Sequence, residues 1–195
     1  MKRLAIFLFS VLTIIFACND KAQHANEQNK FVQVTISENN ITPTVDIKNF
    51  VLISKNTEAE LADAKEIMKI KRKFPLAMQS KSEAQFNYIL AKDFSFRAED
   101  EFYNREDYII DRTTCTDTVT AVKYENLVLQ FFGDIGVLTY RNIVENKGIL
   151  HDSITMDKNW NEFMNWTDIY VKENGNWKIG SVHQIEYRTD ANKIQ

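Results

Sequence analysis

The dipeptide Asn174-Gly175 constrains this chain more than any other feature, because Asn-Gly is the strongest short signal for a two-residue β-hairpin turn. It lies between two runs, residues 161–172 and 176–188, in which apolar and polar residues alternate. Such alternation is typical of strands that bury one face. The sequence therefore predicts an antiparallel hairpin whose register is set by the turn.

This register brings several reactive side chains together. A two-residue turn pairs Glu173 with Asn176, and directly opposed residues on the ladder share one face of the sheet. An uninterrupted ladder would place on one face the residues Trp166, Asp168, Tyr170, Ser181 and His183. Asp168 and His183 would then be diagonal neighbours, and a slip of one residue would separate them.

The rest of the chain places helices before strands. Residues 57–73 and 80–94 have helical spacing, and Pro75 is expected to end or kink the first helix. A short helix at 104–112 and strands at 94–96, 119–132 and 135–145 follow, with 146–160 as a loop or strand extension. This segregation, with a late antiparallel meander, predicts an α+β fold. The apolar share of 44% is enough for a packed core.

The first 17 residues are not part of that core. Lys2 and Arg3 precede an apolar run over 4–17, which is short for a membrane span and typical of a secretory signal. The ending "IIFAC" resembles the lipobox of bacterial lipoproteins, although Phe16 is bulkier than usual. The resemblance implies that Cys18 is lipidated; the alternative is an ordinary signal peptide with an incidental cysteine. We expect a lipid-anchored protein of the bacterial cell envelope, facing the periplasm or the surface.

Residues 18–30 are polar and are expected to form a flexible tether. Residues 31–56 are β-rich and predict an N-terminal extension with hairpin character, where Pro43 favours an edge position. Removal of residues 1–17 takes away two positive charges and moves the formal net charge from -3 to -5. An acidic mature chain has no electrostatic footprint for nucleic acid. The basic run at 65–73 is interpreted as a solvated helix face.

Few side chains indicate a cofactor. With Cys18 modified, Cys115 is the remaining cysteine, so no intradomain disulfide is expected. Cys115 has no neighbouring His or Lys in the sequence and is interpreted as a structural thiol. The three histidines lack metal-ligand spacing, and we expect neither metal nor cofactor.

Four stretches, in this order and spacing, resemble the nuclear transport factor two-like superfamily, and within it the SnoaL-like branch known as domain of unknown function 4440. They are "ILAKDFSF" (89–96), "NREDYI" (104–109), "FFGDIGVLTYR" (131–141) and "WTDIYVKENGNWKIGSVH" (166–183). Gly136 stands where this family usually has alanine. The resemblance implies a cone-shaped domain over 57–190, in which a strongly curved antiparallel sheet wraps around N-terminal helices and encloses a pocket. It also implies a possible homodimer through the outer face of the sheet.

The residues of the expected pocket support more than one function. The ligand-binding hypothesis uses a set of pocket side chains: Trp166, Tyr170, Ser181, His183, Tyr108 and Tyr140. The catalytic hypothesis is an isomerase or hydro-lyase without cofactor, with His183 as base and Asp168 as the group that orients it. In the structural alternative, His183 is a satisfied core histidine, Asp168 is solvated or pairs with Arg141, and Trp166 packs in the core. A third hypothesis is protein–protein interaction through the outer sheet face. We favour a binding module for a small, partly apolar ligand.

Overall fold

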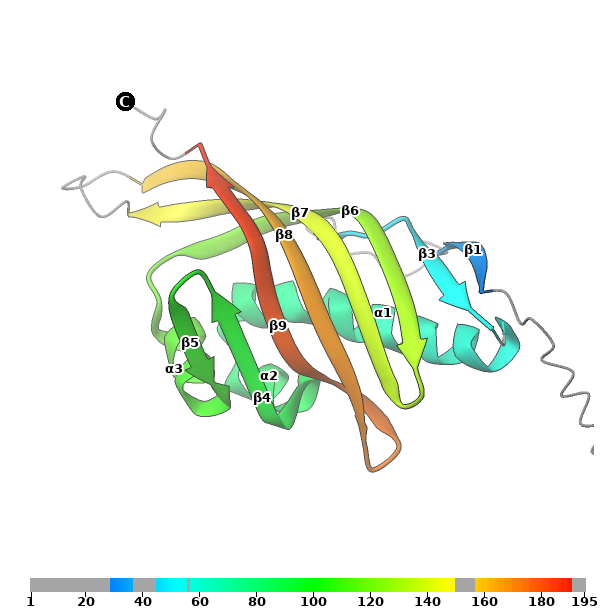
Figure 1. Ribbon diagram of the computed structural model, residues 1–195. Coiled ribbons are helices and arrows are strands. Elements are labelled where there is room, and N and C mark those ends of the chain that lie inside the picture. Colours follow the sequence, from blue (N-terminus) through cyan, green and yellow to red (C-terminus); the bar gives the residue numbers. More distant parts are fainter. Residues whose placement is uncertain (1–28, 37–44, 56, 150–156, 191–195) are drawn as a thin grey trace, which may run out of the picture.

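The computed structural model describes residues 29–36, 45–55, 57–149 and 157–190 (Figure 1). The expected signal peptide, Cys18 and nearly all of the tether lie outside these ranges. Within the described part of the chain, no helix combines the length and the hydrophobicity needed to cross a membrane.

One large curved sheet wraps around a long helix (Figure 1). Its strand order is β1-β3-β6-β7-β8-β9-β4-β5, and β2 pairs with β6 beside this path. The strands are β1 Lys30–Thr35, β2 Val45–Asp46, β3 Asn49–Ser54, β4 Leu90–Ala98, β5 Glu101–Asn104, β6 Thr118–Phe132, β7 Ile135–Ile149, β8 Asp157–Glu173 and β9 Asn176–Thr189. The helices are α1 Thr57–Ser80, α2 Glu83–Ile89 and α3 Arg105–Thr114. The predicted α+β cone is confirmed, with the sheet wrapped on the helices.

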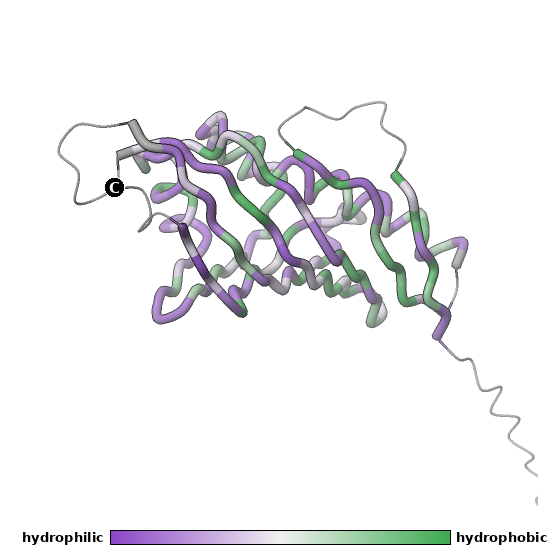
Figure 2. Tube along the Cα trace, turned by 90° about the horizontal axis from the view of Figure 1, so that it is seen from above, coloured by the Kyte–Doolittle hydropathy of each residue, from purple (hydrophilic) through white to green (hydrophobic). Residues whose placement is uncertain are grey.

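The sheet is mixed rather than wholly antiparallel. The meander β6–β9 is antiparallel throughout, as expected. However, β2 and β3 run parallel to β6, and β4 runs parallel to β9. Figure 2 shows apolar and polar residues alternating along the strands, the pattern of a sheet with one face on a core.

Helix α1 lies across the concave face of the sheet and buries one stripe of side chains. Ala64, Ile67 and Met68 follow helical spacing and are almost fully buried. A Cβ atom added at Gly136 on β7 would lie 2.7 Å from Cδ1 of Ile67, so the helix packs closely on the sheet where β7 carries a glycine. The helix continues past Pro75 to Ser80, so this proline does not end it.

Helix α3 begins where the sequence indicated. The side chain of Asn104 accepts a hydrogen bond from the backbone N–H of Asp107 at 3.0 Å, which caps the helix. The helix points Tyr108 inward, where it is 1% exposed. This cap fixes α3 at one end of the cone.

The predicted hairpin register is correct only near the turn. Glu173 pairs with Asn176, and Tyr170 pairs with Ile179, as expected. Beyond Ile179 the register is wrong, because Ile169 pairs with Ser181 and leaves Gly180 as an extra residue on β9. Glycine is typical of such a bulge, since it weakens regular pairing and admits close backbone approach.

A second bulge follows on the same strand. Trp166 pairs with Gln184, whereas its neighbour Asn165 pairs with Glu186, so Ile185 is the extra residue. Each bulge exchanges the inward and outward positions of β9. Gln184 faces the interior after the first bulge, and Tyr187 does so after the second, each together with residues of β8.

The N-terminal strands belong to the same sheet and core. β1 and β3 form an antiparallel pair, and β3 continues the sheet by pairing with β6. Phe50 and Leu52 of β3 are 1% and 0% exposed. The segment expected as an extension therefore supplies core side chains. Pro43 lies outside the described residues.

Candidate ligand-binding cavity

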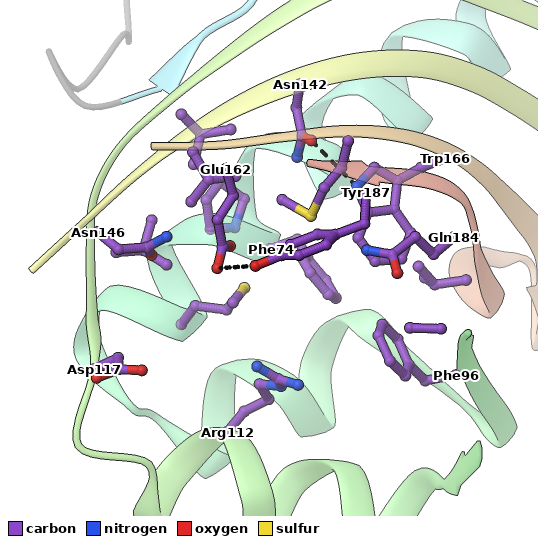
Figure 3. Close-up of a pocket in the computed structure, with 18 of the residues that line it drawn as sticks. Phe74, Phe96, Arg112, Asp117, Asn142, Asn146, Glu162, Trp166, Gln184 and Tyr187 are labelled. Carbon is purple, nitrogen blue, oxygen red and sulfur yellow. Dashed lines mark hydrogen bonds between the residues drawn. The ribbon is translucent and has the colours of Figure 1, made fainter. Parts of the chain in front are cut away.

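A cavity of about 480 Å³ lies between the concave face of the sheet and helices α1 and α3 (Figure 3). Its size is within the range of small-molecule sites. Its aromatic lining consists of Phe74, Phe96, Tyr108, Tyr124, Tyr140, Trp160, Trp166 and Tyr187. The cavity is therefore predominantly apolar where it enters the core.

A buried ion pair lies behind one wall of this cavity, of which Lys71 belongs to the lining and Asp168 does not. Nζ of Lys71 on α1 lies 2.7 Å from Oδ2 of Asp168 on β8, and their side chains are 2% and 0% exposed. The hydroxyls of Tyr140 and Tyr170 donate to the same carboxylate at 3.0 and 3.3 Å. The ammonium of Lys71 also lies 3.7 Å from the ring centroid of Tyr140. Asp168 is thus held by three donors, as a buried carboxylate requires.

The electrostatics of this cluster follow from its burial. Desolvation lowers the pKa of Lys71, and the charge of Asp168 opposes this shift. Burial raises the pKa of Tyr124, Tyr140 and Tyr170 well above 10.0, and the negative charge of Asp168 raises each further. These hydroxyls therefore stay protonated at neutral pH. The hydroxyl proton of Tyr140 is directed to Asp168 rather than into the cavity.

The outer part of the cavity is polar (Figure 3). Oε1 of Glu162 accepts hydrogen bonds from Trp160 Nε1 and the Tyr187 hydroxyl, each at 3.3 Å. Oδ1 of Asn142 accepts from Nε1 of Trp166 at 3.2 Å. These acceptors therefore already have donors from the protein.

Two nitrogen donors of the lining differ from these groups. Nδ2 of Asn146 on β7 is buried and has no hydrogen-bond partner among the described residues. The same holds for Nε of Arg112 on α3, although this atom lies 3.0 Å from a carboxylate oxygen of Asp111. In Figure 3 the Arg112 guanidinium points into the cavity, and Asn146 lines a different wall.

The structure brings together half of the expected ligand-binding set. Trp166, Tyr108 and Tyr140 line the cavity. Tyr170 is not part of the lining and instead supports Asp168 from within the core. Ser181 lies outside the lining and shares a hydrogen bond of 3.0 Å with Ser95 of β4.

The expected pairing of His183 with Asp168 is wrong. The bulge at Gly180 places His183 opposite Thr167, on the outer face, where it is exposed. Asp168 faces the interior and is 0% exposed. The two side chains therefore point to opposite sides of the sheet. The alternative pairing of Asp168 with Arg141 is also wrong, because Arg141 is near Glu125.

Sequence reasoning missed the groups that make the cavity polar. The run 65–73 was interpreted as a solvated face, yet Lys71 is buried. Its position was a usable signal, because it continues the stripe of Ala64, Ile67 and Met68 at helical spacing. Asn146 likewise continues the inward alternation of β7. Arg112 had no comparable signal in the sequence.

Within the described ranges, no group of three or more His, Cys, Asp or Glu side chains is arranged to hold a metal ion. Cys115 is half-buried at the edge of the cavity, and its thiol lies 3.5 Å from the carbonyl oxygen of Arg112.

Solved structures of low sequence identity share this fold. No family model matches the sequence, and no curated protein matches it. A nuclear transport factor two-like protein from Cytophaga hutchinsonii is 17% identical, with a TM-score of 0.53, over 62% of this chain and 95% of that one. A type 2 hexachlorocyclohexane dehydrochlorinase is 15% identical, with a TM-score of 0.56, over 70% and 94% of the two chains.

A putative scytalone dehydratase from Novosphingobium aromaticivorans is 13% identical, with a TM-score of 0.53, over 68% of this chain and 91% of that one. These structures are covered almost completely, whereas about a third of this chain lies outside each match. The chain therefore has the cone fold of nuclear transport factor two-like proteins.

Proposed function

We propose that this chain is a binding protein that encloses a small, partly apolar molecule in the cavity between its sheet and its helices. The observation that carries the proposal is the cavity itself, about 480 Å³ in volume, with an aromatic interior and a few polar groups. Such a combination is the usual form of a small-molecule site. Exposed residues at one end, Glu99 to Glu101 and Asp117, give the ligand an entrance.

Binding fits the chemistry of the site better than the isomerase or hydro-lyase alternative. That alternative required His183 and Asp168 on one face, and they lie on opposite faces. Asp168 itself does not line the cavity and is engaged by Lys71 and two tyrosine hydroxyls. A carboxylate that is buried and already accepts three hydrogen bonds from the protein is poorly placed to take a substrate proton.

A cavity-filling substitution tests the proposal. Val144 lines the cavity and is 7% exposed, whereas its neighbour Ile143 points to the outer face. Val144→Phe should abolish binding of a naphthalene probe, measured by quenching of the cavity tryptophans, and Ile143→Phe should not. Native mass spectrometry of protein purified from a native-like host should find a retained small molecule in the Ile143→Phe control and none in Val144→Phe. Equal binding by both variants would exclude the cavity as the site.

We propose further that the domain is held at the cell envelope by lipid on Cys18, after removal of residues 1–17. The basic start, the short apolar run and the "IIFAC" ending support this proposal. Labelled palmitate should enter the wild-type protein, and Cys18→Ser should lose both the label and the membrane fraction. Membrane retention of an unlabelled Cys18→Ser protein would contradict lipid anchoring.

The outer face supports a homodimer. Phe132 and Ile135 oppose each other at the β6–β7 turn and are 57% and 43% exposed, and Ile185 is 67% exposed. Exposed apolar groups of this kind favour association. Sedimentation should show a dimer that Ile185→Arg dissociates, and a wild-type monomer at high concentration would refute it.

A further inference from the structure

We infer that the ligand is a neutral molecule with a flat apolar body and a carbonyl or hydroxyl oxygen, which accepts hydrogen bonds from Asn146 and Arg112. This inference rests on the proposed binding function and adds the chemical class of the ligand.

The first observation is the unmet donor of Asn146. The residue is 5% exposed and lies on the inward side of β7, and its Nδ2 has no partner among the described residues. A buried donor without an acceptor is costly, and native proteins retain few of them. A ligand oxygen at this position would supply the missing acceptor.

The second observation is Arg112 on the facing helix. Its side chain is 27% exposed, and its Nε is a buried donor without a hydrogen bond of adequate geometry. The guanidinium carbon lies 5.3 Å from the ring centroid of Tyr108, so the group lies against an aromatic wall of the cavity. Figure 3 shows it directed toward the space that Asn146 also borders.

The neighbouring acceptors do not need a ligand donor. Glu162 accepts from Trp160 and Tyr187, and Asn142 accepts from Trp166. The buried polar atoms of this site that lack a partner among the described residues are therefore hydrogen-bond donors. This asymmetry selects a ligand that brings an acceptor oxygen.

The negative charge at the entrance of the cavity favours a neutral ligand oxygen over an anionic one. Carboxylates line it from the β4–β5 turn, at Glu99, Asp100 and Glu101, and from Asp117 and Glu162. The positive charge of Arg112 is already matched by Asp111 at 3.0 Å. A ligand carboxylate would enter a negative field, which lowers both its local concentration and its affinity.

The body of the ligand is indicated by the aromatic walls. The rings of Phe96 and Trp166 have centroids 5.7 Å apart, and those of Phe96 and Tyr108 are 5.0 Å apart. Planar apolar surface packs favourably against such rings. A bicyclic aromatic probe is therefore a reasonable test molecule.

The experiment compares three probes that share one naphthalene body. They are 2-ethylnaphthalene, which has no acceptor, 2-acetonaphthone, which has a neutral carbonyl, and 2-naphthoate, which is anionic. Dissociation constants are measured by tryptophan quenching with the full chain. We expect 2-acetonaphthone to bind about fivefold to tenfold more tightly than 2-ethylnaphthalene, the factor that a net hydrogen bond contributes. We expect 2-naphthoate to bind more weakly than the ketone.

Variants assign the effect to the two donors. Asn146→Leu keeps the size of the side chain and removes the donor, so the ketone should lose its advantage while 2-ethylnaphthalene binds unchanged. Arg112→Met should reduce ketone binding in the same way. Asn165→Leu, on the outer face of β8, is the matched control and should change neither.

The outcomes separate this inference from the proposed function. Tightest binding of 2-naphthoate, or a ketone advantage that survives Asn146→Leu, would overturn the inference. If all three probes bound equally and Val144→Phe abolished their binding, the inferred ligand class would be overturned and the proposed binding function would stand. Binding of none of the probes would refute both.

Discussion

Removal of the charge on Asp168 is the perturbation that most directly tests the buried cluster. Asp168→Asn keeps the shape of the side chain but leaves the Lys71 ammonium without its counter-ion, at a position that is 2% exposed. Breaking a buried ion pair from one side costs about 3–5 kcal/mol. The lysine can limit this cost by releasing its proton.

That limit can be calculated. Deprotonating a lysine whose ordinary pKa is 10.5 costs about 1.4 kcal/mol per pH unit, or about 4.8 kcal/mol at pH 7 and about 2 kcal/mol at pH 9. Desolvation lowers the pKa of Lys71 and is unopposed once the charge of Asp168 is removed, so in the variant the unfolded chain binds more protons at this lysine and the variant's stability rises with pH toward 10.5. The loss caused by Asp168→Asn should therefore shrink by up to about 2.7 kcal/mol between pH 7 and pH 9.

Urea unfolding at the two pH values measures these quantities. The control is Lys71→Met combined with Asp168→Asn, which removes both charges and should lie within about 2 kcal/mol of the wild type, since such replacements are often neutral. A loss below about 1 kcal/mol for Asp168→Asn alone, equal at both pH values, would refute a buried lysine cation.

Gly136→Ala should destabilise the fold by about 1–2 kcal/mol, because its Cβ meets Ile67, and adding Ile67→Val should recover part of the loss in urea unfolding; no recovery would place the strain elsewhere. His183→Ala should leave the affinity of the naphthalene probes unchanged, because the side chain is on the outer face, and a tenfold loss would contradict the bulged register. Wild-type stability should fall above pH 10 by about 1.4 kcal/mol per pH unit for each buried tyrosine, because the raised pKa keeps the hydroxyl neutral in the folded state while the unfolded chain loses the proton; a flat profile between pH 10 and pH 11 in denaturant titrations would argue against their burial.

Local signals account for the parts of the fold that the sequence predicted correctly. The Asn174-Gly175 turn, the cap at Asn104 and the helical spacing of α1 each depend on residues a few positions apart. The order of these elements was therefore predictable, and so was the family of folds that it resembles. The parallel pairing of β3 with β6 was not, because it depends on contacts between distant segments.

The site was less predictable because its geometry depends on interruptions of the pattern. Alternation from the hairpin turn held up to Ile179, and the isolated Gly180 was the one local signal that a bulge would follow. The second bulge, at Ile185, has no such signal. The inward face predicted for Trp166 is confirmed because this residue lies on β8, whereas the inward face predicted for His183 is wrong because this residue lies beyond Gly180 on β9.

The place of β3 in the sheet has a consequence for the timing of folding. Val51 of β3 pairs with Val128 of β6, so the β1–β3 pair, made early during synthesis, cannot join the rest of the sheet until β6 has been made. Until then, Phe50 and Leu52 have no core to enter, although both are almost fully buried at the end. Pairing across so many residues is slow compared with closing a hairpin. The first strands of the chain to be synthesised are therefore expected to be the last to dock.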